Sequence, residues 1–454
     1  MASRVFISTE CSQCGGIINL EEGTNAVKCP YCSSSFLITG YDKVLTYYIS
    51  NNVEERRSAI QTLAHRHLLT YTDHYRIVDI NLFFLPFYHL KGKIFRLVPD
   101  VQVDIPMSYP TSVSRSKIKT SYLNKSFLAT TLEGLAVYSL GIRTSVLQLK
   151  LFKSGTLAAK GKVYPVAFGI DKALEIGLGK NQDNGSYSRV ISKMLSVVYA
   201  PVWEVNVKGI GRAFSIIIDG LGETITDDNA PFQFLTENLK EEEQKNFPTI
   251  SFHALKCPNC GWDIPADPSL YVFVCDNCRW VWECTTHGFR EVSGTIVQPH
   301  PERELPELTY LPFWVFPART ETKHHLPKGI KMAKLFIPAF KVRDLSVIYR
   351  LATIFTKVQP ELDLTSLSGD YSFSRIEGAV MRWKDARELS ELFVGMGLEK
   401  TGISMERETA RQLIWFPFYE RGIFLRDAIL NAGIQKAKIR SPKLPTLPSQ
   451  SVEH

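Results

Sequence analysis

The sequence predicts an α+β fold: two small zinc ribbons, each followed by mainly antiparallel β-hairpin modules with a few packed helices. Three observations lead to this class. A set of four cysteines with one spacing occurs twice, an apolar stretch with a proline and a following aromatic residue recurs five times, and amphipathic helical segments interrupt the strands. Strand-rich segments joined by helices that do not alternate regularly are typical of α+β proteins.

Eight of the nine cysteines share the spacing C-x2-C-x14-C-x2-C. Two residues between paired cysteines let one tight turn direct two thiolates at one metal, and structural zinc takes four such ligands and leaves no open position. Disulfides or a redox dithiol are the alternatives, but neither export nor a strand-to-helix context is visible. We expect two structural Zn²⁺ ions, with iron not excluded by the ligands. The ligands are Cys11, Cys14, Cys29, Cys32, Cys257, Cys260, Cys275 and Cys278.

The residue after each second cysteine favours a tight turn. Gly15, Ser33 and Gly261 stand there in three of the four CxxC pairs, and we expect a positive φ at this position. The fourth pair has Arg279 instead, which weakens the turn signature and leaves the ligand intact.

This cysteine pattern resembles the zinc-ribbon family, which also occurs in transcription-initiation factors, RNA-polymerase subunits and rubredoxin-like proteins. The order of ribbon, "YYIS" strand, amphipathic helix and "LPFY" hairpin is similar to a group of uncharacterised prokaryotic proteins with two zinc ribbons. The likeness covers the first 100 residues or so, and the second half loosely. It implies structural zinc and no particular activity.

The proline motif is unusual because a central strand should not tolerate proline. We interpret each copy as the first arm of a β-hairpin in which proline marks a bulge or a strand change, and the aromatic residue two positions later as a packing residue. The copies are "LFFLPFY" (82–88), "VVYAPVW" (197–203), "LTYLPFWVF" (308–316), "LFIPAF" (335–340) and "LIWFPFY" (413–419).

Helices are expected over 51–69, 186–199, 374–397 and 425–433, and a turn at Lys91–Gly92. The second ribbon begins 246 residues after the first, which indicates a duplicated module. The expected domains are ribbon 1 (1–40), module 1 (41–237), a linker (238–252), ribbon 2 (253–293), module 2 (294–433) and a basic, proline-rich tail (434–454).

The net charge of +7 is concentrated in residues 105–170, which carry nine basic residues and one acid. Such a segment can meet nucleic acid, lipid headgroups or an acidic protein, and a solvated face is the alternative. Both ribbons are slightly acidic, which disfavours contact with a duplex. The candidate residues are Arg115, Lys117, Lys119, Lys125, Lys150, Lys153, Lys160 and Lys162.

No phosphate loop, HExxH, GxSxG or dinucleotide fingerprint is present, so we expect no catalytic residues. The sequence favours a non-enzymatic interaction or assembly protein that binds a protein partner. The alternatives are a nucleic-acid-binding protein that uses 105–170, peripheral membrane contact by the same segment, and an enzyme whose site is built from distant residues. No apolar stretch of transmembrane length and no signal-peptide core occur, and we expect a cytoplasmic location.

Overall fold

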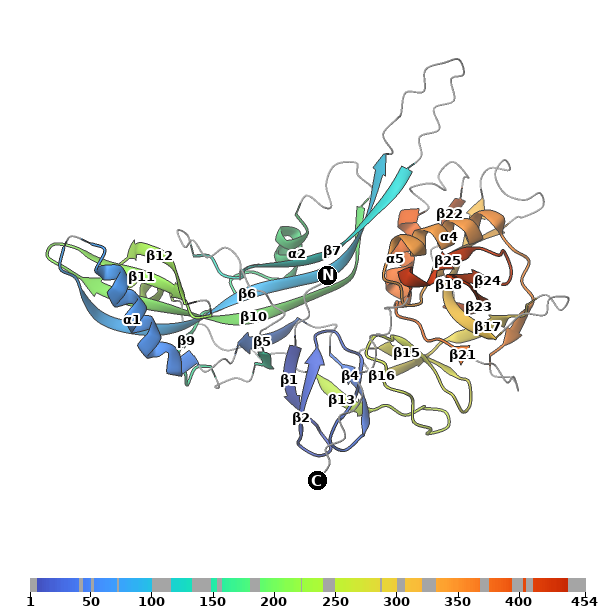
Figure 1. Cartoon of the computed structure of the whole chain (residues 1–454), viewed down its shortest axis with the longest axis horizontal. Coiled ribbons are helices and arrows are strands. Elements are labelled where there is room, and N and C mark those ends of the chain that lie inside the picture. The colour runs from blue at the N-terminus through green and yellow to red at the C-terminus, as the bar shows by residue number, and fades with distance from the viewer. Residues whose placement is uncertain are drawn as a thin grey trace, which may run out of the picture.

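The computed structural model describes residues 6–40, 44–49, 53–71, 73–99, 116–132, 148–152, 157–179, 188–221, 223–239, 250–285, 288–299, 307–320, 332–367, 375–393, 403–405 and 411–439. Of the described residues, 50% lie in strands and 17% in helices, and the sheets are built from antiparallel hairpins, so the predicted α+β class is confirmed. Two large sheets, two small three-stranded sheets and a few helices make up the described fold (Figure 1).

The first large sheet has ten strands and is organised around two long ones, β6 (Arg76–Pro99) and β10 (Ser188–Lys208), which run antiparallel through the left of Figure 1. Three helices belong to this half: α1 (Arg57–Leu68), α2 (Ile170–Leu178) and α3 (Phe234–Glu237). The other strands are β1 (Phe6–Glu10), β2 (Ile17–Glu21), β5 (Leu45–Ile49), β7 (Ser116–Leu128), β8 (Gln148–Leu151), β9 (Lys162–Val163), β11 (Ala213–Asp219) and β12 (Thr224–Pro231).

The second large sheet has nine strands around β18 (Leu308–Thr320) and β23 (Gln412–Arg421), with helices α4 (Ser346–Val358) and α5 (Trp383–Phe393) packed on it. The remaining strands are β17 (Ser293–Val297), β19 (Met332–Pro338), β20 (Leu364–Ser366), β21 (Arg375–Ile376), β22 (Ile403–Met405), β24 (Phe424–Asp427) and β25 (Gly433–Gln435). Short 3-10 helices cover Val53–Arg56 and Lys436–Lys438.

The two small sheets lie side by side at the bottom of Figure 1. Three of the four cysteine pairs flank their strands, and the pair Cys11 and Cys14 lies in the turn between β1 and β2 of the first large sheet. One has the order β13–β4–β3 and the other β14–β15–β16. Their strands are β3 (Ala26–Lys28), β4 (Ser35–Thr39), β13 (Ser251–Ala254), β14 (Val272–Val274), β15 (Val281–Thr285) and β16 (Gly288–Glu291).

Alternating side chains of β6 join two cores. Phe83, Leu85 and Phe87 pack with residues of the first small sheet, whereas Phe84 and Tyr88 pack with α1 and the other face. This two-residue period is that of a strand buried on both faces. The first small sheet is therefore held against a rigid surface of the larger sheet.

The same pairings occur in both large sheets. In the first sheet, Pro86 of β6 is opposite Tyr199 of β10, and Pro201 of β10 is opposite Phe84 of β6. In the second sheet, Pro312 of β18 is opposite Trp415 of β23, and Pro417 of β23 is opposite Tyr310 of β18. In each sheet a short parallel strand pairs with the first proline strand, at the residue two positions before the proline. These strands are β9, which pairs with β6, and β21, which pairs with β18. A parallel strand also joins each second proline strand: β5 on β10 and β17 on β23.

Four of the five proline motifs are the first arms of hairpins, as expected: β6–β7, β10–β11, β18–β19 and β23–β24. The expected bulge is wrong, because the register is continuous at each of these prolines. Each proline directly precedes the first residue of its strand that pairs with the second arm of the hairpin. The proline carbonyl accepts a hydrogen bond from the residue that directly follows the last paired residue of the second arm. These donors are the N–H groups of Ala129, Gly220, Ala339 and Ala428, at 2.8, 3.0, 2.9 and 2.8 Å.

The carbonyl that a proline N–H would reach is already occupied. Ala339 O, opposite Pro312, accepts the N–H of Val380 at 2.7 Å, and Ala129 O, opposite Pro86, accepts that of Ala167 at 2.9 Å. A residue without an N–H therefore removes a competing donor from a central strand, which explains a proline where a ladder would normally exclude it.

Three local predictions are wrong. Residues 80–98, expected to turn at Lys91–Gly92, continue as one strand. Residues 425–433 cover the end of β24, a turn and the first residue of β25. The described part of the expected helix at 186–199, residues 188–199, belongs to β10, where a bulge between Ile191 and Met194 breaks the two-residue alternation. Pairing with β6 along its length decides the strand. The first helix is present as α1, and α5 covers only part of 374–397.

Candidate metal centres

Four cysteine side chains of the first ribbon meet at one point. Sγ of Cys11 is 3.8 Å from Sγ of Cys32, and Sγ of Cys14 is 3.8 Å from Sγ of Cys29. All four sulfurs lie within 4.8 Å of one another. Cys11 follows β1 and Cys29 follows β3, so two hairpin ends bring the pairs together although 14 residues separate them.

The second ribbon forms an equivalent group. The Sγ–Sγ distances are 3.6 Å for Cys257–Cys278 and 3.6 Å for Cys260–Cys275, and these four sulfurs also lie within 4.8 Å of one another. The side chain of Trp282 adds a polar contact, because its Nε1–H donates to Sγ of Cys257 at 3.3 Å.

These distances fit a tetrahedral metal site. Four thiolates at about 2.3 Å from one ion would have sulfurs about 3.8 Å apart, whereas a disulfide would need about 2.05 Å. No disulfide joins the described cysteines. Both groups can hold a metal ion, and four thiolates are a donor set that suits zinc. The ninth cysteine, Cys284, is buried in β15, where burial raises the pKa of its thiol.

Four matching turns orient the thiolates. The N–H of Gly15 donates to the carbonyl of Cys11 at 2.9 Å, and Ser33, Gly261 and Arg279 make the same bond to the first cysteine of their pairs at 3.0, 2.8 and 2.9 Å. All four residues have a positive φ, between 60° and 73°. The predicted backbone is confirmed at Gly15, Ser33 and Gly261. Arg279, where the turn signature was weaker, adopts the same left-handed conformation.

An aromatic ring packs on the turn that follows Cys14 in the first ribbon. A Cβ atom on Gly16 would lie 2.5 Å from the ring of Tyr31, so the ring packs directly on that glycine. The corresponding positions 246 residues later hold Trp262 and Asn277, which reverses the order of large and small residues. Tyr31 keeps 67% and Trp262 58% of its surface exposed.

A buried carboxylate anchors the first ribbon to the long sheet. The Glu22 side chain is 1% exposed and lies 2.6 Å from Nζ of Lys91 and 3.6 Å from Nδ1 of His89. The hydroxyl of Ser196 donates to it at 2.7 Å, and Nε2 of His89 lies 2.6 Å from Oδ1 of Asn124. Local sequence patterns gave no signal for this group, because its members come from four separate strands and turns.

The charges in this cluster shift each other's titration. Burial by itself raises the pKa of Glu22, but the positive charges of Lys91 and His89 and the hydrogen bonds outweigh it, so its pKa is lowered. Burial lowers the pKa of His89, with Lys91 adding to the shift and Glu22 opposing it. The second ribbon has a comparable anchor in Glu283, which accepts from the N–H of Trp383 at 3.2 Å and from Arg411 at 2.7 Å.

The basic candidates do not converge within the described residues. Lys119 and Lys125 are exposed on β7, Lys150 on β8, and Lys160 and Lys162 at or beside β9. On β6, Lys162 stands opposite Phe83 and Lys119 stands opposite Arg96. The two lysines are therefore separated by about 40 Å along the direction of β6. Arg115 and Lys153 lie outside the described residues, as does the side chain of Lys117.

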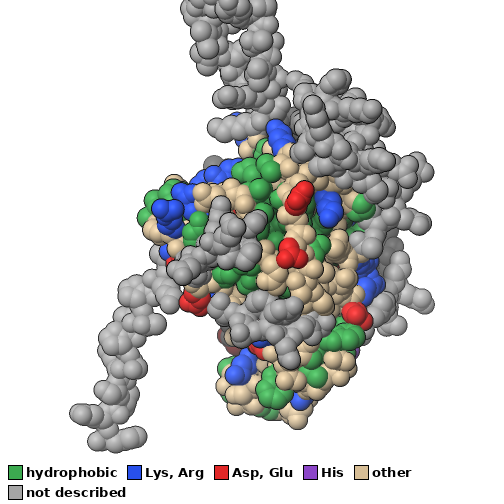
Figure 2. All heavy atoms as spheres, turned by 90° about the vertical axis from the view of Figure 1, so that its right-hand side faces the viewer, with side chains coloured by type: hydrophobic (Ala, Val, Ile, Leu, Met, Phe, Trp, Pro, Cys, Tyr) green, Lys and Arg blue, Asp and Glu red, His purple; other side chains and the backbone are tan. Residues whose placement is uncertain are grey.

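Two of these lysines also make contacts within the chain. Nζ of Lys125 donates to the carbonyl of Ile176 at 2.9 Å, and Nζ of Lys162 lies 5.4 Å from the centre of the Phe83 ring. Figure 2, which shows the side of the second sheet, has acidic, basic and hydrophobic side chains interspersed among the coloured residues. Among the described helices, none is long and apolar enough to cross a membrane.

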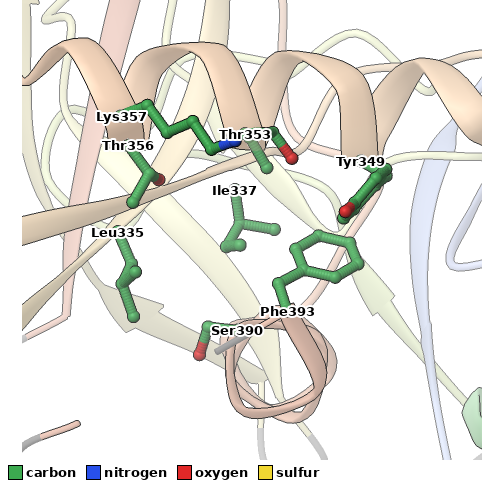
Figure 3. A pocket seen from close by; sticks show the side chains of 9 residues that line it. Leu335, Ile337, Tyr349, Thr353, Thr356, Lys357, Ser390 and Phe393 are labelled. Carbon is green, nitrogen blue, oxygen red and sulfur yellow. The ribbon is translucent and has the colours of Figure 1, made fainter. Parts of the chain in front are cut away.

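A small pocket opens between α4, α5 and β19 (Figure 3). Leu335 and Ile337 form its floor, and Thr353, Lys357 and Phe393 stand around it. Its volume of about 30 Å³ holds roughly two water molecules.

Comparison with known proteins gives no relative: no family model, no curated protein and no solved structure matches the chain. The resemblance to zinc ribbons therefore rests on the two cysteine groups and their geometry.

Proposed function

We propose that the protein is a non-enzymatic, zinc-stabilised interaction or assembly protein whose ribbon tips contact a protein partner in a larger complex. The eight cysteines of the two ribbons would hold two Zn²⁺ ions in closed sites, so the metal would shape the surface and take no part in a reaction. Zinc is preferred to iron because all-thiolate structural sites commonly hold zinc.

The observation that carries this proposal is the surface of the ribbon tips. Tyr31 and Ile17 of the first ribbon are 67% and 59% exposed, and Trp262 of the second is 58% exposed. The tip segments 12–17, 30–34 and 257–262 contain no charged residue, and the fourth, 275–280, carries one acid and one base, Asp276 and Arg279. Exposed aromatic residues in a surface with few charges are typical of protein–protein contact centres, whereas phosphate recognition uses lysine and arginine.

We also infer that the chain is a duplication. The expected halves are ribbon 1 (1–40) with module 1 (41–237) and ribbon 2 (253–293) with module 2 (294–433), joined by 238–252. Support comes from the shared strand pairings and from two hydrogen bonds at matching places: the Tyr88 hydroxyl donates to Phe168 O at 2.7 Å, and Trp314 Nε1 donates to Met381 O at 2.9 Å. Two similar tips would suit a partner that contacts both ribbons.

Variants at the tips test the proposal. We would purify the full chain from its own cells under mild cross-linking and compare wild type with Tyr31→Ser and Trp262→Ser, using mass measurement of the native complexes. Ile423→Ser is the matched control, because Ile423 is 68% exposed but lies in the β23–β24 turn. Central aromatic contacts contribute about 2 kcal/mol or more, so the tip variants should lose a given partner roughly 30-fold, and the control should not.

A chain that stays monomeric and without a partner in extract would overturn the proposal, as would a partner retained equally by all variants. Binding of nucleic acid by segment 105–170 stays a separate hypothesis. A filter-binding titration checks it, because phosphate contacts give a steep dependence on salt.

A further inference from the structure

We infer that the two metal sites are thermodynamically coupled: the paired ribbons form one metal-dependent unit, in which the ion at each site stabilises the other site. This inference does not depend on the proposed partner. It follows from the way the two ribbons share a strand, hydrogen bonds and a core.

The shared strand is β13. It pairs antiparallel with β4 of the first ribbon, from Ser251 opposite Thr39 to Ala254 opposite Phe36. In the second ribbon the matching edge of β15 is taken by β16, with Gly288 opposite Thr285. The third strand of ribbon 1 is thus supplied by the segment that enters ribbon 2, and it ends three residues before the ligand Cys257.

Hydrogen bonds extend this contact. The N–H of Leu255, two residues before Cys257, donates to Ser35 O at 3.0 Å. From the first ribbon, the side-chain amide of Asn25 donates to Leu270 O at 3.0 Å, and its backbone N–H contacts Pro268 O at 3.4 Å. Asn25 is 3% exposed and directly precedes β3, the strand that leads into Cys29.

The two ribbons also share one hydrophobic core. Ala26 and Leu37 of ribbon 1, both fully buried, belong to a cluster whose other members come from ribbon 2 or its entry, including Leu255, Phe273 and Trp282. Two ligands of the second site, Cys257 and Cys275, are in the same cluster. The edge-to-face rings of Phe36 and Phe252, 5.8 Å apart, add a further contact.

Metal loss at one site would therefore reach the other. Ribbons of this size have too little core to fold alone, and the free energy of metal binding is largely their folding free energy. Without its ion, ribbon 1 would release β3 and β4, and with them the contacts that hold β13 and the residues before Cys257. Coupling between sites in proteins typically changes affinity by about 5–150-fold, and linkage makes it equal in both directions.

The test uses the full-length, zinc-loaded protein. Cys14→Ser disables site 1 and Cys260→Ser disables site 2; both cysteines are exposed, so neither change removes a core side chain. A colorimetric chelator reports release of the remaining zinc, and competition with a chelator of known affinity gives its Kd. Each variant should bind its remaining ion more weakly by about 5–150-fold relative to the same site in wild type, with similar factors in the two directions. Retention with unchanged affinity in both variants overturns the inference.

A second pair of variants guards against general misfolding, because it leaves all eight cysteines in place. Asn25→Ala removes the cross-ribbon hydrogen bond of its side chain, and Asn19→Ala is the matched control, an exposed asparagine of β2 in the same ribbon. In the Asn25→Ala background, Cys14→Ser should weaken site 2 by a smaller factor than in wild type. In the Asn19→Ala background the factor should be unchanged. Equal factors in both backgrounds would contradict coupling through this interface.

Discussion

Replacing Glu22 with alanine should release the first ribbon from the long sheet. The carboxylate is 1% exposed and contacts Lys91 at 2.6 Å and Ser196 at 2.7 Å. It balances the positive charge of Lys91 and lies 3.6 Å from Nδ1 of His89. Breaking a buried ion pair by removing one partner costs about 3–5 kcal/mol. Because Lys91 remains 20% exposed and can gain some hydration, we expect the lower end, about 3 kcal/mol.

Native-state hydrogen exchange is the suitable assay, because a chain with several cores need not unfold in one step. The amides of Ile18 and Leu20, buried in β2, should exchange roughly 150-fold faster in Glu22→Ala, the ratio that corresponds to about 3 kcal/mol. Glu10→Ala is the matched control, a glutamate of the same ribbon at an exposed position. Equal exchange rates in wild type and Glu22→Ala would refute the reasoning.

The same cluster predicts a pH dependence. The pKa of Glu22 is lowered in the folded state, so its contribution is complete above its unfolded value near 4.3 and is lost as pH falls through the folded value. The pKa of His89 is also lowered, so stability begins to fall below about pH 6.5, where the unfolded state takes up a proton that the folded state excludes. In Glu22→Ala the first of these losses should disappear, which exchange measured from pH 8 down to about pH 3, and corrected for the intrinsic exchange rate at each pH, would detect.

Three further predictions concern single residues. Gly15→Ala should weaken metal binding at site 1 by about 1–2 kcal/mol, because its φ is 73°, while Gly169→Ala, at φ −78°, should leave metal affinity unchanged in a chelator competition. Trp282→Phe should speed metal release from site 2 about tenfold, through loss of the N–H bond to sulfur; an unchanged rate would contradict a role for that bond. Pro312→Ala should lower stability by about 1–3 kcal/mol in thermal unfolding, because the new N–H competes with that of Val380; equal or higher stability would show the explanation to be wrong.

The local features were predictable from the sequence. Each cysteine group lies within 22 consecutive residues, and CxxC turns bring their own thiolates together, so spacing alone indicated both metal groups. The turn residues also predicted the positive φ at Gly15, Ser33 and Gly261, and Arg279 has the same conformation. The α+β class and the hairpins that start at the proline motifs also followed, because apolar periodicity and turn residues act over a few neighbours.

Long-range contacts decided what the sequence could not show. The strand at 188–199 follows from pairing with β6, about 100 residues earlier, which overrides the local preference for helix. The prolines fit central strands because distant chain segments occupy the opposing carbonyls. The sequence by itself determined the two metal groups and the turns that shape them; only the tertiary structure placed β13 on β4 and Glu22 beside Lys91, because such contacts depend on the free energy of burying segments that are far apart in the chain.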